Sequence, residues 1–254
     1  MLVENSIWPL TTTITALSLI IGVIAGDLTL AYLSLLLLLV SMYYWWKEVV
    51  IESTYQGQHN EQVKRNLTIG FILFVISEAM IFFSLFFAYF YNSTPALGGG
   101  PHIFVGGVWP PVGIEVLDAG AVPLLNTVIL FMSGISVTAS QHYMVTGNKN
   151  KSINYLLITI ILGVIFMALQ YFEYVNSLFT ISDSVYGASF YILTGFHGFH
   201  VLVGVIFLLV SLIRLGLSHY SDKGGLNATF ASIYYHFVDV VWIFLYAVIY
   251  CNIL

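Results

Sequence analysis

Four polar residues with helical spacing lie inside apolar segments of this chain. His197 and His200 are three residues apart in TGFHGFH, and His236 and Asp239 have the same spacing in YYHFVDVVW. Residues three apart share one face of a helix, so each pair projects together. Two chemistries are open to such pairs, namely metal ligation and hydrogen bonding between helices. No third ligand is evident at the same depth, and no histidine spacing suits a dihaem bundle. We therefore predict a His–Asp hydrogen-bond network between helices, without haem, zinc or copper.

Two acidic residues in apolar segments carry separate predictions. Glu78 lies midway along FVISEAMIFF, where an ionised carboxylate costs at least ~2.5–3.5 kcal/mol on membrane insertion. One interpretation is a carboxyl that exchanges protons or contacts lipid. The other is a protonated Glu78 that hydrogen-bonds to a neighbouring helix. Glu173 shares a helix face with Gln170, and we expect its side chain to reach the membrane–water interface on the outer side of the bilayer.

The composition is that of an integral membrane protein. Only 7% of the 254 residues are charged, 59% are hydrophobic, and the mean hydropathy is +0.93. A water-soluble domain could not bury so much apolar surface, so lipid must cover it. The single Cys251 excludes an intrachain disulfide, a four-cysteine iron–sulfur cluster, a c-type haem site and a thiolate-bridged dicopper centre. No basic cluster suggests a nucleic-acid partner.

Seven segments are long and apolar enough to span a bilayer as helices. They lie near 9–26, 30–50, 67–91, 122–146, 153–176, 186–214 and 230–253. Residues 92–121 hold four of the six prolines and many glycines, which predicts a long loop. We see no internal repeat, and we expect residues 1–254 to form one all-α integral membrane domain. The opening MLVENSIWPL lacks the features of a targeting signal.

With seven spans, every Lys and Arg falls on one side of the membrane. These residues are Lys47, Lys64, Arg65, Lys149, Lys151, Arg214 and Lys223. Basic residues concentrate on the cytoplasmic or matrix face, so we expect the N-terminus on that face and the C-terminus on the other.

Five polar residues on this inner face are candidates for lipid headgroup binding. They are Lys47, Glu52, His59, Arg214 and His219. Basic pockets between helices can hold anionic headgroups, although ordinary snorkelling explains the same pattern.

Seven long motifs together resemble subunit III of a haem–copper cytochrome c oxidase of the mitochondrial kind. They are WWKEVVIESTYQGQH, FVISEAMIFF, WPPVGIE, VPLLNTVIL, FTISDSVYG, TGFHGFHVLVG and YYHFVDVVWIFLY, and the resemblance runs from about Trp8 onward. It implies a two-helix group and a five-helix group around a lipid-filled cleft. It also places Glu78 on the family's intramembrane carboxyl, and Glu52, His59, Arg214 and His219 on positions that contact phospholipid headgroups. Residues 98–107 look like an insertion in the outer loop.

The resemblance further implies a function without catalytic or cofactor-binding residues in this chain. Haem a and copper would reside in partner subunits of a complex that passes electrons from cytochrome c to oxygen and pumps protons. This chain would pack on subunit I, stabilise it, bind phospholipids and support proton uptake, with subunit II and accessory subunits nearby. The expected location is the mitochondrial inner membrane, with the N-terminus in the matrix and the C-terminus in the intermembrane space. The alternatives are subunit III of a quinol oxidase and an independent proton-coupled carrier.

Overall fold

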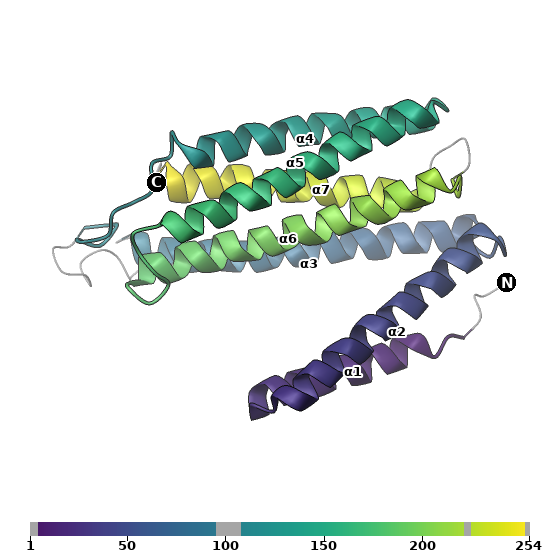
Figure 1. Cartoon of the computed structure of the whole chain (residues 1–254), viewed down its shortest axis with the longest axis horizontal. Coiled ribbons are helices and arrows are strands. Elements are labelled where there is room, and N and C mark those ends of the chain that lie inside the picture. Colours follow the sequence, from purple (N-terminus) through teal and green to yellow (C-terminus); the bar gives the residue numbers. More distant parts are fainter. Residues whose placement is uncertain (1–4, 95–107, 221–224, 252–254) are drawn as a thin grey trace. The chain divides into compact units, whose positions relative to one another are not determined.

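The computed structural model describes residues 5–94, 108–220 and 225–251, and the part described is all helical (Figure 1). Within these described ranges, seven helices are long and apolar enough to cross a membrane, which confirms the predicted fold class and span count. They are α1 (Trp8–Ala25), α2 (Leu28–Thr54), α3 (Glu61–Ser93), α4 (Val122–Val145), α5 (Lys149–Asn176), α6 (Val185–Gly216) and α7 (Leu226–Leu245), and α7 continues as a π-helical turn over Tyr246–Tyr250.

Several helices extend beyond the apolar segments that predicted them, because polar side chains cap them outside the hydrocarbon. Asp27 caps α2 by accepting the backbone N–H of Leu30 at 3.1 Å. Asn148 similarly accepts from the N–H of Lys151 at the start of α5. Such caps satisfy N–H groups that a first helical turn leaves unbonded. A hydropathy window detects only the apolar part of each helix and therefore misses these turns.

The described chain separates into two compact units, one ending at Ile69 and the other beginning at Gly70. In the first unit, α1 and α2 form a close antiparallel hairpin. A Cβ added to Gly22 would lie 2.8 Å from the backbone nitrogen of Ala31, so glycine permits this approach. Near the other end of the hairpin, the rings of Trp8 and Tyr44 stack with centroids 5.2 Å apart. The lipid cleft between helix groups stays a prediction.

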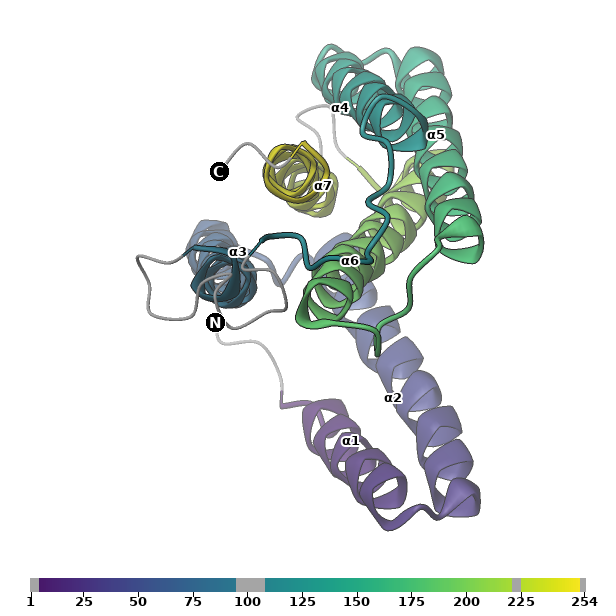
Figure 2. The same cartoon turned by 90° about the vertical axis from the view of Figure 1, so that its left-hand side faces the viewer.

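In the second unit, α4, α5, α6 and α7 pack in a closed ring, each against two neighbours. Figure 2 looks along these helices and shows the ring from its end. Large side chains fill its centre, among them Phe166, Tyr235 and Trp242, each at most 1% exposed. A Cβ at Gly163 would lie 2.6 Å from Val205 Cγ2, so α5 can approach α6 only because of this glycine.

The part of α3 in this unit packs on α6 and α7 through aromatic side chains. Phe71 stacks on Phe230 with a centroid separation of 4.3 Å, and Phe74 stacks on Tyr234 at 6.1 Å. Phe82 makes an edge contact with the His200 ring at 4.9 Å. Positions 71, 74, 78 and 82 are three or four residues apart, so Glu78 belongs to the packed face of α3.

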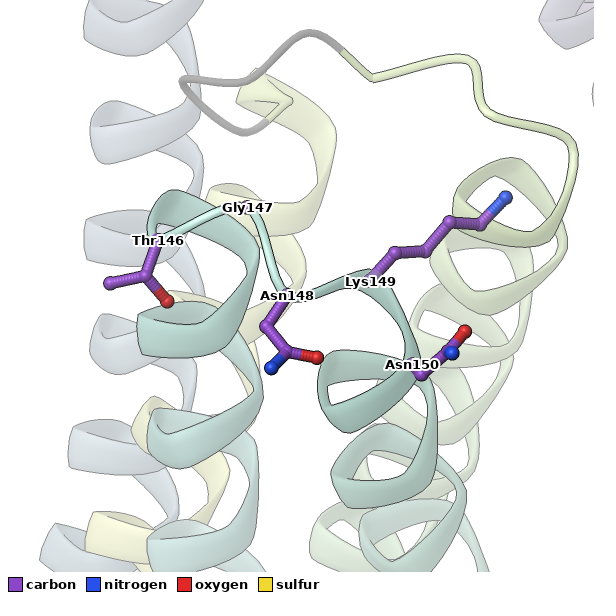
Figure 3. A pocket seen from close by; sticks show the side chains of 5 residues that line it. All are labelled: Thr146, Gly147, Asn148, Lys149 and Asn150. Carbon is purple, nitrogen blue, oxygen red and sulfur yellow. The ribbon is translucent and has the colours of Figure 1, made fainter.

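At one end of the ring, Lys149 ties the start of α5 to the end of α6. Its Nζ donates to the Gly216 carbonyl at 2.8 Å and to Ser218 Oγ at 2.7 Å. Figure 3 shows this side chain extending from the α4–α5 turn, where Gly147 has a φ of 79°. A lysine at a helix C-terminus satisfies carbonyls that the helix leaves unbonded. Lys149 therefore has a packing role in addition to its predicted role as an orientation signal.

Two sequence predictions fall on residues outside those described. The proposed insertion at 98–107 and the orientation signal Lys223 both lie there. They stay predictions.

Candidate functional site

The first candidate group is an acid–imidazole pair between α3 and α6. Glu78 Oε2 lies 2.8 Å from His200 Nε2, and the two side chains are 19% and 5% exposed. The Phe82 and Tyr234 rings contact the imidazole, with centroids 4.9 and 6.3 Å away. The structure thus brings together two predicted site residues that the sequence analysis had not paired. It favours the second interpretation of Glu78, hydrogen bonding to a neighbouring helix.

The hydrogen bonds of His200 determine how many protons this pair holds. His200 Nδ1 lies 2.6 Å from the Phe196 carbonyl oxygen, which can only accept, so Nδ1 must carry a hydrogen. In neutral imidazole, Nε2 is then an acceptor facing the carboxyl oxygen of Glu78. Their 2.8 Å hydrogen bond therefore requires one proton between them, on either Glu78 or Nε2. In either position, the pair as a whole is electrically neutral.

The second candidate group is the His236–Asp239 pair within α7. His236 Nδ1 lies 3.6 Å from Asp239 Oδ2, and the side chains are 44% and 15% exposed. His236 Nε2 lies 3.1 Å from Thr138 Oγ1 on α4, and that hydroxyl donates to the Gly134 carbonyl. Because the Thr138 hydrogen is used there, Nε2 donates to Thr138 and Nδ1 faces the carboxyl. At 3.6 Å the facing atoms of His236 and Asp239 make no hydrogen bond, unlike those of Glu78 and His200.

Gly134 and Asp239 explain how α7 and α4 come close at this depth. A Cβ at Gly134 would lie only 2.8 Å from Asp239 Oδ2. Asp239 Oδ1 is buried and has no hydrogen-bond partner among the described residues. The Asp239 carboxyl therefore lies against the backbone of α4, and one of its two oxygens lacks a hydrogen-bond partner among the described residues.

His197 belongs to neither pair. Its Nε2 donates to the Val238 carbonyl at 3.2 Å, and its ring packs against Phe166 and Trp242. The predicted His–Asp hydrogen-bond network between helices does not form among the described residues. His197 bonds to backbone, His200 bonds to α3, and Asp239 contacts the histidine of its own helix. Spacing along one helix could not reveal the partners of His197 and His200, because those partners lie on other helices.

A series of buried, hydrogen-bonded polar side chains lies near one end of the ring, and the sequence analysis did not predict these contacts. Tyr250 donates to Glu173 Oε1 at 2.6 Å, Gln170 Nε2 donates to Tyr250, and Asn126 Nδ2 donates to Gln170. Glu173 is 4% exposed, so the prediction that it reaches the interface is wrong. The physical reason is the tyrosine hydroxyl, which lets the carboxyl stay inside the bundle. The shared face of Gln170 and Glu173 was the available signal.

The lipid-binding candidates lie at helix ends or within about two turns of them, in both units. Arg214 lies in the last turn of α6, and its guanidinium lies over the Tyr220 ring at 5.1 Å. His219 follows, with its backbone N–H bonded to the Arg214 carbonyl at 3.0 Å. In the first unit, Lys47 lies over the Tyr44 ring at 5.9 Å. Glu52 and His59 flank the end of α2.

Among the residues that the structure describes, no group of three or more His, Cys, Asp or Glu side chains could hold a metal ion. The fold and site define a seven-span membrane protein in which acids pair with imidazole or tyrosine groups.

Comparison with known proteins identifies the family. The family described as Cytochrome c oxidase subunit III matches residues 1–252. Among similar proteins, each named Cytochrome c oxidase subunit 3, that of Allomyces macrogynus is 46% identical over 98% of this chain and 91% of its own length. Those of Paracentrotus lividus and Triticum aestivum are 44% and 42% identical over 98% of this chain, covering 95% and 94% of their lengths. The chain belongs to the cytochrome c oxidase subunit III family.

Membership in this family confirms the function predicted from the motifs. The chain is a subunit of an oxidoreductase complex, and the quinol-oxidase and carrier alternatives are not supported. Its helices make it a multi-pass membrane protein.

Proposed function

We propose that this chain is the non-redox subunit of a proton-pumping oxidase in the mitochondrial inner membrane, where it stabilises the catalytic subunit I and binds phospholipids. The family match over residues 1–252 carries the proposal. Haem a and copper belong to partner subunits in this scheme. Subunit II and accessory subunits complete the complex, which takes electrons from cytochrome c. The N-terminus faces the matrix and the C-terminus the intermembrane space.

Purification tests this assignment. A tagged version of this chain, isolated in mild detergent, should bring with it haem a and copper bound to other polypeptides. An independent carrier would instead purify without haem and would transport protons by itself in liposomes. The second result would contradict the proposal.

Phospholipid binding at the end of α6 is supported by the chemistry of Arg214. A guanidinium presents five N–H donors in a planar fork, which suits a phosphate group better than a lysine ammonium does. Its position in the last turn of α6, against the Tyr220 ring, gives it the depth of a headgroup. His219 lies in the turn that follows. Lys47, Glu52 and His59 are proposed to act similarly at the end of α2.

A double substitution tests this lipid site. Arg214→Ala with His219→Ala should remove an acidic phospholipid from the purified complex, as measured by mass spectrometry of extracted lipids. The matched control is Lys64→Ala with Arg65→Ala, which removes two inner-face charges that are not among the lipid-binding candidates. Unchanged lipid content in the first variant, or equal loss in both, would contradict a specific site.

A further inference from the structure

An open groove runs along α4 and α7, beside the His236–Asp239 pair. Its volume is about 1010 Å³, and its α4 wall extends from Thr127 to Tyr143. Sixteen residues of helix rise roughly 24 Å, most of the ~30 Å hydrocarbon thickness. Phe131, which is 63% exposed, is among its apolar lining residues. The groove is therefore long enough for either a lipid tail or a helix.

The middle of this groove is polar. The His236 side chain is 44% exposed, and Asp239 lines the groove beside it. Asp239 lies near the centre of the span from Leu226 to Tyr250, where water is absent. The 3.6 Å separation of the facing atoms exceeds normal hydrogen-bond length. A lipid tail offers neither donor nor acceptor, so it would leave these groups exposed to hydrocarbon at a cost in free energy.

We propose that the groove seats a membrane-spanning helix of another subunit, and that this helix brings a hydroxyl or amide side chain to His236 and Asp239. This inference rests on the proposed function, since it requires partner subunits. Hydroxyl and amide groups both donate and accept, so one such group can bridge the imidazole and the carboxyl wherever the proton resides. Side chains of this kind commonly join helices in membranes.

Charge disfavours other occupants of the groove. An incoming Lys or Arg would have to enter the hydrocarbon as a charged group, at a cost in free energy, whereas a hydroxyl or amide side chain is neutral. A second copy of this chain related by twofold symmetry would bring another acid–imidazole pair to the same place. That arrangement would crowd two acids together without supplying a neutral bridging group.

Photo-crosslinking in the purified complex tests this proposal. The probe is p-benzoylphenylalanine at position 131, in place of Phe131 of the groove. The matched control carries it in place of Phe172, which is 55% exposed on α5 and does not line the groove. The probe at 131 should capture a membrane-spanning peptide of one other subunit, identified by mass spectrometry, and the control should not capture that peptide. Capture only of lipid, of a second copy or of this chain's residues 8–54 would overturn the proposal.

A groove-filling substitution provides the second measurement. Ile135→Trp should lower the retention of the captured subunit about tenfold, equivalent to a loss of about 1.4 kcal/mol of binding free energy. Ile161→Trp on α5 is the control, since both isoleucines are similarly exposed, at 53% and 55%. Unchanged retention in Ile135→Trp would overturn the proposal. The proposed function has its own test, since it is contradicted only if the wild-type chain purifies without haem a.

Discussion

The two acid–imidazole pairs differ in where they lie, although their chemistry is nearly the same. Glu78 and His200 join two helices at 2.8 Å, with the imidazole almost fully buried. His236 and Asp239 lie on one helix at 3.6 Å, with the imidazole half exposed in a groove. The enclosed pair shares one proton and is neutral, because His200 Nδ1 must donate to the Phe196 carbonyl, whereas the facing atoms of the open pair make no hydrogen bond. The enclosed pair therefore joins two helices, whereas the open pair leaves polar groups exposed in a groove.

The enclosed pair matters for the position of α3. This helix packs on α6 and α7 mainly through flat aromatic rings, including Phe71 on Phe230 and Phe74 on Tyr234. Stacked rings tolerate sliding more readily than a directional hydrogen bond does. We therefore expect the Glu78–His200 bond to fix the register of α3 against α6.

The largest expected effect is that of His200→Ala. It removes a buried ring and leaves Glu78 without its partner, so the free energy of unfolding should fall by about 3 kcal/mol. Denaturation of the purified complex with increasing SDS measures this change. The matched control is His236→Ala, and an equal loss in both variants would contradict the distinction between the pairs.

Glu78→Gln should have a smaller effect, below about 1 kcal/mol. Glutamine keeps a donor that can reach His200 Nε2, so the neutral interhelical bond persists. The complex should assemble normally, which haem a content and subunit composition would show. Failure to assemble would mean that the ionised carboxylate is needed for structure. Glu78→Leu, which lacks a donor, is the control and should lose more stability than Glu78→Gln.

Thr138→Val is expected to have the smallest effect, about 0.5 kcal/mol or less in the free energy of unfolding. It removes the 3.1 Å bond from a half-exposed His236 and a hydroxyl bond to the Gly134 carbonyl of its own helix, and valine keeps nearly the same shape. The same SDS titration measures it. A loss as large as that of His200→Ala would show that the open pair also holds helices together.

Much of the fold followed from the sequence, because hydropathy and the one-sided basic residues define spans directly. The helix ends did not, since caps such as Asn148 lie in polar sequence outside the apolar windows. Glu78, His200, His236 and Asp239 were recognised as unusual because each is polar within an apolar segment. The interhelical partners of Glu78, His200 and His236 could not be predicted, because the spacing of residues within one helix says nothing about the rotation of the next helix. The periodic stripe of Phe71, Phe74, Glu78 and Phe82 is the signal that could have shown Glu78 facing the bundle.

Two double-mutant cycles in the purified complex test the distinction between the two pairs most directly. One combines Glu78→Leu with His200→Leu, and the other combines His236→Leu with Asp239→Leu. Hydrogen bonds between membrane helices give coupling energies averaging about 0.6 and reaching about 1.7 kcal/mol. We expect about 1 to 1.7 kcal/mol for the enclosed pair and less than about 0.5 kcal/mol for the open pair. Coupling near zero between Glu78 and His200, or stronger coupling between His236 and Asp239, would contradict the distinction.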